Sequence, residues 1–268
     1  MNIFDLSNEV AVVIGAGGVL GGAIAHGLAQ AGAKIAVLDF LPEPGEARAK
    51  AIRDDGGQAQ YFFANAVQRE TLQAAHQAIQ KSLGAPSVLV NAAGGNDPKV
   101  TVTPDMPFEK IALADWQANF NLNLVGGALL SCQEFGPAMA ARAKGSIINI
   151  ASVSAHIPLS RVVSYSASKA AVLNLTQFLA REWAPTGVRV NSITPGFFPA
   201  GQNRKLLFNE DGTPNDRTKQ IWNHTPMGRF GEPQELVGAA IFLASHKASG
   251  FVTGTDIRVD GGFLCQTI

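Results

Sequence analysis

The sequence predicts a single α/β domain of the doubly wound, Rossmann-like type, with about seven parallel strands and helices on both faces of the sheet. Short β-branched runs alternate with longer runs of helical period, which is the pattern of repeated βαβ units. A glycine-rich turn joins the first of these strands to the first helix. No Pro/Gly/Ser-rich linker or repeat divides the 268 residues, so we expect one domain over residues 1–268.

Each expected element rests on its local residue pattern. The strands are short apolar runs rich in β-branched residues: Val10–Ile14, Lys34–Asp39, Gln58–Phe63, Ser87–Asn91, Ser146–Ala151, Arg189–Thr194 and Asp256–Val259. The helices are Ala- and Leu-rich runs of helical period: Gly22–Ala31, Glu43–Asp55, Arg69–Leu83, Asp115–Ala141, Ser164–Trp183 and Pro233–Ser245. The stretch Phe197–Pro226 is polar and irregular, so we expect it to be a substrate lid.

Composition favours a cytoplasmic protein that binds a small molecule. The 21 basic and 21 acidic side chains cancel, which gives no electrostatic footprint for nucleic acid or anionic lipid. We find neither a signal-type N-terminus nor an apolar run near the about 18 residues that a membrane helix needs. Cys132 and Cys265 lie far apart, as reduced thiols do, and the five histidines lack metal-ligand spacing. We therefore expect no metal, no nucleic acid and no membrane partner.

The turn after the first strand has the composition of a dinucleotide-binding loop. It reads Gly15-Ala16-Gly17-Gly18-Val19-Leu20-Gly21-Gly22 and leads into a helix. Glycines permit positive φ and let a pyrophosphate approach the N–H groups at a helix N-terminus. A tight βα connection without a ligand is the alternative interpretation.

Asp39 strengthens the cofactor interpretation, because it ends the second strand, where an acidic residue accepts hydrogen bonds from ribose hydroxyls. Its charge would repel a 2′-phosphate, and Phe40 and Leu41 offer no cation to receive one. The sequence therefore favours NAD(H) over NADP(H). A solvated strand end is the alternative for Asp39.

Tyr165 and Lys169 are four residues apart on an expected helix and so share one face. A neighbouring cation stabilises phenolate, so we expect the Tyr165 proton to become transferable near neutral pH, with the oxidised nicotinamide as a second positive charge. Ser152 ends a strand and could hydrogen-bond the substrate oxygen. By itself a Tyr/Lys pair is more often structural.

These features occur together with Asn91-Ala92-Ala93-Gly94, Asn123-Leu124-Val125-Gly126 and Pro195-Gly196, and Ser152 stands thirteen residues before Tyr165. In this combination the chain resembles the short-chain dehydrogenase/reductase family over essentially its whole length. The resemblance implies a catalytic set of Asn123, Ser152, Tyr165 and Lys169. In it Tyr165 is the acid/base, Lys169 its activator and a ribose ligand, Ser152 the carbonyl polariser and Asn123 the holder of a relay water.

The resemblance also implies the cofactor-binding set. It comprises Gly15, Gly17, Gly18, Val19, Leu20, Gly21, Asp39, Asn65, Ala66, Asn91, Ala92, Gly94, Tyr165, Lys169, Pro195 and Gly196. The last strand and its Asp260-Gly261-Gly262 sequence resemble the family's assembly surface, which implies a homotetramer.

Three positions depart from the family pattern. Ile14 stands where the glycine turn usually has Thr, and Val19 stands in place of its middle Gly. Asn65 followed by Ala66 replaces the usual adenine-binding Asp, although an amide still accepts a hydrogen bond. Asn91-Ala92 replaces the commoner Asn-Asn pair.

Polar loops around Ser152 suggest a sugar acid or a polyol as the substrate of an NAD-dependent alcohol/ketone oxidoreductase. They could bind several hydroxyls and, in a sugar acid, a carboxylate, for which an arginine fork is suited. The expected substrate-binding residues are Asn96, Ser152, Ser154, Arg161, Tyr165, Asn203 and Arg204, with His156 as a further candidate for the pocket lining. Gly94-Gly95-Asn96 and the residues after Pro195 resemble the branch of mannonate/fructuronate oxidoreductases. The alternatives are a 3-oxoacyl thioester reductase, which needs an apolar channel and generally NADPH, and a non-catalytic NAD-binding regulator.

Overall fold

The computed structural model of the protein describes residues 2–199 and 207–267. Within these ranges the chain forms a seven-stranded sheet in the order β3-β2-β1-β4-β5-β6-β7, with all pairs parallel. The strands are β1 (Val10–Ile14), β2 (Lys34–Asp39), β3 (Gln58–Phe63), β4 (Val88–Asn91), β5 (Gly145–Ile150), β6 (Val188–Pro195) and β7 (Asp256–Val259). The predicted fold class and strands are confirmed, with strand ends displaced by no more than one residue.

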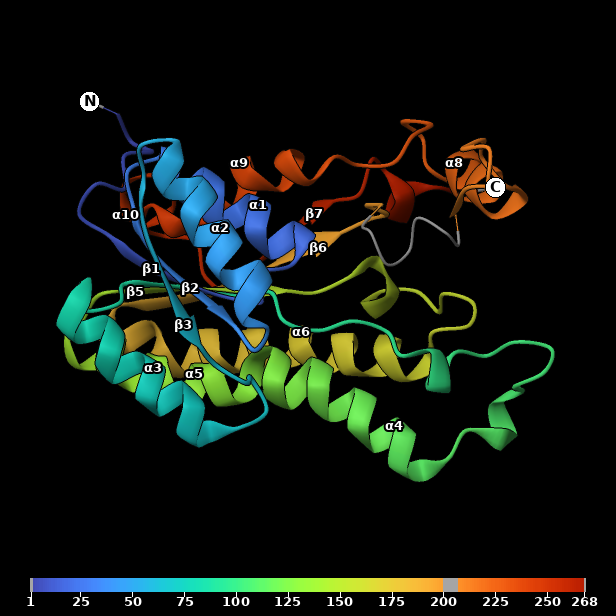
Figure 1. The fold of residues 1–268 in the computed structure, drawn as a ribbon, viewed down its shortest axis with the longest axis horizontal. Coiled ribbons are helices and arrows are strands. Elements are labelled where there is room, and N and C mark those ends of the chain that lie inside the picture. Colours follow the sequence, from blue (N-terminus) through green and yellow to red (C-terminus); the bar gives the residue numbers. More distant parts are fainter. Residues whose placement is uncertain (1, 200–206, 268) are drawn as a thin grey trace.

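Helices cover both faces of the sheet (Figure 1). The described helical segments are α1 (Val19–Gln30), α2 (Pro42–Asp54), α3 (Arg69–Ser82), α4 (Leu113–Phe120), η3 (Asn121–Leu129), α5 (Leu130–Ala141), α6 (Val163–Trp183), α8 (Asp216–His224), α9 (Val237–Ala244) and α10 (His246–Ser249). Helices α1, α2 and α9 lie on one face, and α3, α5 and α6 lie on the other.

Strands β1 to β6 contribute side chains to two separate apolar cores, because successive side chains point to opposite faces. In β1, Val13 packs in the core that contains Leu28 of α1, whereas Val12 packs in the core that contains Leu72 of α3 and Phe135 of α5. All five of these side chains are fully buried. Burial on both faces explains why β1 and the interior of β2 are continuous apolar runs rather than alternating ones.

The strand order reverses between β1 and β4, and in doubly wound sheets ligands bind beyond the carboxyl ends of strands at such a switch point. The turns that leave these two strands touch there. A Cβ placed on Gly15, after β1, would lie 2.8 Å from the backbone nitrogen of Ala93, after β4. Helix α8 and the first turn of α4 lie at one end of the molecule, on the right in Figure 1.

The predicted helix Asp115–Ala141 is divided into three segments. Its middle, Asn121–Leu129, has π-helical hydrogen bonding between the α-helical segments α4 and α5. The side chain of Asn123 donates to the carbonyl of Asn119, four residues earlier, at 2.9 Å. An α-helix would use that carbonyl for its own N–H ladder, so the side chain competes with the helix, and such π segments often mark functional positions.

Two further boundaries differ from the sequence-based expectation. The predicted helix Pro233–Ser245 begins as a 3-10 turn over Pro233–Leu236, because Glu232 and Glu235 form a capping box around it. The expected lid contains helix α8, whose N-cap Asn215 accepts a hydrogen bond from the Thr218 N–H at 3.0 Å. In the part of the chain that the structure describes, none of the helices is both long and apolar enough to cross a membrane.

Candidate active site

The glycine turn presents uncapped backbone N–H groups. Gly15 has φ +79°, and a Cβ on Gly21 would lie 2.4 Å from the Gly15 carbonyl oxygen, so both positions require glycine. Gly18 is the N-cap of α1 and makes no side-chain capping bond. The first N–H groups of α1 thus lack a side-chain acceptor, and such a helix N-terminus suits the negative charge of a pyrophosphate.

Asp39 is tied to this turn. Its Oδ2 accepts from the Gly17 N–H at 2.9 Å, and its Oδ1 accepts from the Leu41 N–H at 3.1 Å. A Cβ on Gly17 would lie 2.8 Å from Oδ2, so glycine is needed for this contact. Each carboxylate oxygen keeps acceptor capacity after one hydrogen bond, which leaves Asp39 able to receive ribose hydroxyls.

The positions that depart from the family pattern lie at the end of β1, at the start of α1 and after β3. Ile14 is buried in the sheet, and Val19 is 39% exposed at the start of α1, next to the partly buried Leu20. Asn65 Oδ1 accepts from the Val67 N–H at 3.2 Å, and the adjacent Ala66 is buried. A contact between Asn65 and the adenine of a cofactor therefore stays a prediction.

Asn91 supports the sheet with its side chain. Its Nδ2 donates to Asn149 Oδ1 at 2.8 Å, and its Oδ1 accepts from Ser131 at 2.7 Å, which links β4 to β5 and α5. The residue is 1% exposed. Both amide ends are therefore engaged inside the protein, and any contact of Asn91 with a cofactor would come from its backbone.

Asn123 organises the loop after β4. Its Oδ1 accepts from the Gly95 N–H at 2.9 Å, and its Nδ2 donates to the Gly95 carbonyl at 2.8 Å. Asn119 donates to the same carbonyl at 3.0 Å and is itself 3% exposed. Gly94 has φ +140°, and a Cβ on it would lie 2.6 Å from Asn123 Oδ1 and 3.6 Å from Lys169 Nζ. These contacts join the turn after β4 to the Tyr/Lys helix.

Ser152, Ser154 and Tyr165 form a chain of hydroxyl groups. Ser154 donates to Ser152 Oγ at 3.0 Å, and the Ser152 hydroxyl lies close enough to the phenol of Tyr165 to lower its pKa. Ser152 and Ser154 are 8% and 4% exposed. Of the two predicted substrate ligands in this turn, Ser154 thus contacts Ser152, and Ser152 contacts Tyr165.

Lys169 lies beneath Tyr165 on α6. Its Nζ is 5.7 Å from the centroid of the Tyr165 ring and donates to the Ile150 carbonyl at 2.7 Å. Burial lowers the pKa of Lys169 to about 8. Burial also raises the pKa of Tyr165, and the hydrogen bond from Ser152 opposes this rise. The expected titration of the phenol near neutral pH also involves the positive charge of a bound nicotinamide, so it stays a prediction.

The low pKa of Lys169 predicts a pH-dependent stability. Between pH 8 and 10.5 the unfolded chain binds a proton at Lys169 that the native protein does not, so this residue makes the native state more stable as pH rises. Over that window we expect the unfolding free energy of the wild type, minus that of Lys169→Met, to increase by up to about 3 kcal/mol. Urea unfolding at several pH values measures this difference. A flat or falling difference would contradict the buried ammonium, and Lys219→Met, at an exposed position, is the control.

The remaining predicted cofactor and substrate residues that the structure describes lie in different loops or at the end of β6. Asn96 Nδ2 donates to Thr101 Oγ1 at 2.6 Å within its own exposed loop. Arg161 is exposed and has φ +77°, and its carbonyl accepts from the Val102 N–H at 2.9 Å. Pro195 is buried at the end of β6, and the Gly196 N–H donates to the Val259 carbonyl at 2.9 Å. Asn203 and Arg204 lie outside the described residues.

Arg217 of α8 is a candidate that the sequence analysis missed. Burial, together with the positive charge of Arg161, lowers the pKa of Arg217, so the two guanidinium groups repel each other. Within residues 2–199 and 207–267, neither guanidinium has an ion pair or hydrogen bond. The sequence signal for Arg217 is Asn215, a favourable N-cap residue for the helix that contains Arg217. The sequence analysis missed it because the surrounding polar segment has no regular pattern.

Comparisons with known proteins identify the family of the chain. Residues 15–264 match a family model described as enoyl-(acyl carrier protein) reductase. The chain is 36% identical to D-threitol dehydrogenase from Mycolicibacterium smegmatis, over 98% of this chain and 95% of the relative. The chain belongs to the short-chain dehydrogenase/reductase family. This confirms the resemblance that the sequence motifs indicated.

Two solved structures of this family are closely similar to the chain. One is a protein from Haemophilus influenzae, provisionally described as a D-mannonate oxidoreductase, with bound NAD. It has a TM-score of 0.92 and 38% identity, over 98% of this chain and 97% of the other. The second is gluconate 5-dehydrogenase from Burkholderia cenocepacia in complex with NADP and tartrate, with a TM-score of 0.89 and 33% identity over 99% of both chains. These relatives thus include both an NAD and an NADP complex.

Proposed function

We propose that the protein is an NAD-dependent oxidoreductase that interconverts a secondary alcohol and a ketone on a sugar acid of the fructuronate/mannonate type. The observation that carries the proposal is the group formed by the partly buried Tyr165 with the buried Lys169 and Ser152, which lies next to the Ala93-Gly94 turn that also approaches Gly15 of the dinucleotide-type glycine turn. Relatives named for mannonate, gluconate and threitol chemistry support the substrate class.

In this proposal Tyr165 takes the proton from the substrate alcohol during oxidation and returns it during reduction. Ser152 lies beside the phenol and would share its hydrogen bond with the substrate oxygen, which stabilises a developing alkoxide. Ser154 holds Ser152, and the Lys169 ammonium adds positive charge below the ring. Asn123 keeps the Gly95 loop in place. A bound nicotinamide supplies the acceptor or donor of the hydride.

The residues around the switch point fit such a dinucleotide. The uncapped N-terminus of α1 would receive the pyrophosphate, and Asp39 would receive the ribose hydroxyls. The negative charge of Asp39 disfavours a 2′-phosphate at the same place. The preference for NAD(H) over NADP(H) is therefore part of the proposal.

The substrate carboxylate would be held between Arg161 and Arg217. The positive charges of Arg161 and Arg217 repel each other, and neither has an acidic partner among the described residues. An anion bound between them would therefore stabilise both charges. Arginine is suited to this because its planar fork binds a carboxylate through two hydrogen bonds. Arg161 lies four residues before Tyr165, and the proposal places the carboxylate on the same molecule whose carbinol meets the phenol.

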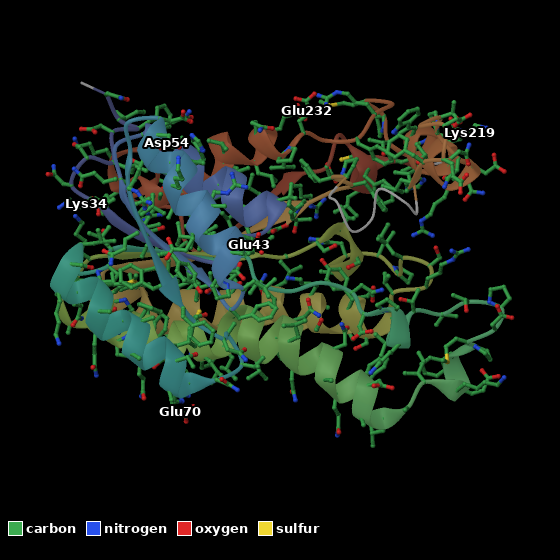
Figure 2. The ribbon with its side chains drawn as sticks, in the orientation of Figure 1. Lys34, Glu43, Asp54, Glu70, Lys219 and Glu232 are labelled. Carbon is green, nitrogen blue, oxygen red and sulfur yellow. The ribbon has the colours of Figure 1, made fainter. Side chains whose placement is uncertain are left out.

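Arg217→Ala tests the carboxylate contact. We expect kcat/KM for an acidic ketose such as fructuronate to fall about ten- to a hundredfold, because a hydrogen bond to a charged group is worth about 1.5–3 kcal/mol. The rate with a neutral ketose should not change. Lys219→Ala on the same helix is the matched control, since Lys219 lies at the outer edge of α8 (Figure 2). Equal losses with acidic and neutral substrates would refute the contact.

A thioester reductase is the second candidate, favoured by the description of the matching family model. It needs an apolar channel, whereas the charges of Arg161 and Arg217 make the α8 side of the site polar. Purified protein with NADH and, in parallel, fructuronate, tagaturonate, neutral ketoses and an acetoacetyl thioester decides between them. Loss of reduced-nicotinamide absorbance with the acidic ketoses supports the proposal, a response only to the thioester favours the second candidate, and no response to any of them favours a regulator.

Assembly as a homotetramer and a cytoplasmic location remain proposals. Exposed apolar side chains on α4, η3 and α6 support self-association: Leu113, Leu122 and Phe178 are 70%, 40% and 57% exposed. Such side chains are often covered by a partner subunit.

A further inference from the structure

A second polar cluster lies next to the Ser152 turn, at the ends of β6 and β7. His156 Nε2 is 3.2 Å from Asp256 Oδ2 and 3.3 Å from Thr194 Oγ1. Asp256 Oδ1 accepts from Ser192 at 2.6 Å and from Thr194 at 2.8 Å. Ser192 and Thr194 are 1% and 0% exposed, and the side chains of His156 and Asp256 are each 20% exposed. The cluster joins the segment after β5 to two neighbouring strands.

The hydrogen bonds fix which ring nitrogen carries a proton. Asp256 Oδ1 already receives two hydroxyl groups, whereas Oδ2 is buried and has no partner in hydrogen-bond geometry among the described residues. The imidazole of His156 is within ion-pair distance of Oδ2. A carboxylate only accepts, so Nε2 must be protonated to make this contact favourable.

His156 and Ser152 are the two ends of one tight turn. Ser152 is the N-cap of the 3-10 turn Val153–Ala155, and its side chain accepts from the Ser154 N–H at 3.2 Å. His156 is the C-cap, and its N–H donates to the Val153 carbonyl at 3.1 Å. The backbone before the turn is fixed by the Ala151 N–H, which donates to the Ile193 carbonyl of β6 at 2.8 Å. The side chain of His156 anchors the other end of the turn to Thr194 of β6 and Asp256 of β7.

We propose that His156 is a positioning residue, which through Asp256 and Thr194 holds the Ser152 turn so that the Ser152 hydroxyl meets Tyr165. The inference rests on the Ser152–Tyr165 contact of the proposed function. It replaces the sequence-based view of His156 as a pocket-lining residue, since the ring nitrogen is used inside the protein.

The Tyr165 phenol reports on this arrangement directly. The chain has two tyrosines, Tyr61 and Tyr165, so a Tyr61→Phe background leaves Tyr165 as the one source of the tyrosinate absorbance band. The Ser152 hydrogen bond lowers the pKa of Tyr165, and Lys169 is the charged group beneath the ring. In that background we expect His156→Phe to raise the titration midpoint of Tyr165 toward that of Ser152→Ala. His156→Gln, whose amide can donate to Asp256, should restore the midpoint.

The double variant Ser152→Ala/His156→Phe separates positioning from a general loss of structure. If His156 acts through Ser152, Tyr165 in this double variant has the same titration midpoint as in Ser152→Ala alone. His156→Phe should then lower turnover about ten- to a hundredfold when Ser152 is present, and should cause no further loss in the Ser152→Ala background. His246→Phe, at an exposed position on α10, is the control and should leave both readouts unchanged. Circular dichroism verifies folding, and His156→Leu replaces the Phe variant if the latter does not fold.

Two results would overturn the inference. A midpoint that rises for Ser152→Ala but stays at the parent value for His156→Phe would refute the role of His156 and leave the proposed function intact. A midpoint that does not respond to Ser152→Ala would remove the Ser152–Tyr165 contact, and the proposed catalytic arrangement would fail with it. The titration needs no substrate, so a different substrate class affects neither result.

Discussion

Replacing Tyr165 with phenylalanine should lower turnover at least about a hundredfold and leave the affinity for the dinucleotide nearly intact. Phenylalanine keeps the ring that packs beside Lys169 and removes only the hydroxyl that meets Ser152. The loss should therefore appear in kcat rather than in cofactor binding. Steady-state kinetics and a titration of NAD binding measure the two quantities on the same preparation.

The matched control is Tyr61→Phe. The Tyr61 hydroxyl donates to the Asp39 backbone carbonyl at 3.1 Å, away from the Ser152 turn, so its loss should leave turnover near that of the wild type. Full turnover in Tyr165→Phe would remove the phenol from the reaction. A variant that loses turnover and cofactor binding together would show that the ring, rather than the hydroxyl, is what matters.

Asp39→Asn should shift the cofactor preference toward NADP(H), by about tenfold or more in the ratio of the two affinities. The carboxylate charge disfavours a 2′-phosphate, and the amide removes that charge. The amide oxygen can still accept from the Gly17 N–H, so NAD(H) binding should fall only modestly. Asp39→Ala removes this hydrogen bond as well and should weaken both dinucleotides, with the same relative shift. Equilibrium titrations with NADH and NADPH at one fixed salt concentration provide the ratio.

Asp54→Ala is the charge control for this experiment. Asp54 pairs with Lys50 at 2.6 Å and lies at the opposite end of α2 from Glu43 (Figure 2). Its removal changes the net charge of the protein by the same amount, far from Gly17. An affinity ratio that moves equally in both variants, or in neither, would refute the specific role of Asp39.

The strands and the catalytic positions were predictable because their signals are local. A strand that packs apolar side chains on both faces is a continuous apolar run, as in β1, in the interior of β2 and in the first three residues of β4, so the limits of these strands can be found in the sequence. Tyr165 and Lys169 share a helix face through their spacing alone.

Other features depend on contacts between distant segments, which spacing does not encode. The π segment around Asn123 arises because its side chain binds both Gly95 and the Asn119 carbonyl. The electrostatic repulsion between Arg217 and Arg161 involves segments that lie before and after β6 in the sequence. The raised pKa of Tyr165 follows from burial, which no helix spacing predicts.

Hydride transfer itself is the most direct test of the proposed function. NADH that carries deuterium at both positions of its hydride-donating ring carbon is incubated with the wild-type protein and fructuronate or tagaturonate, and the product is analysed by mass spectrometry. We predict one deuterium, bound to the carbinol carbon of the sugar acid, and at least about a hundredfold less of this product with Tyr165→Phe over the same period. A reduced product without deuterium, or no product from any acidic or neutral ketose, would contradict it.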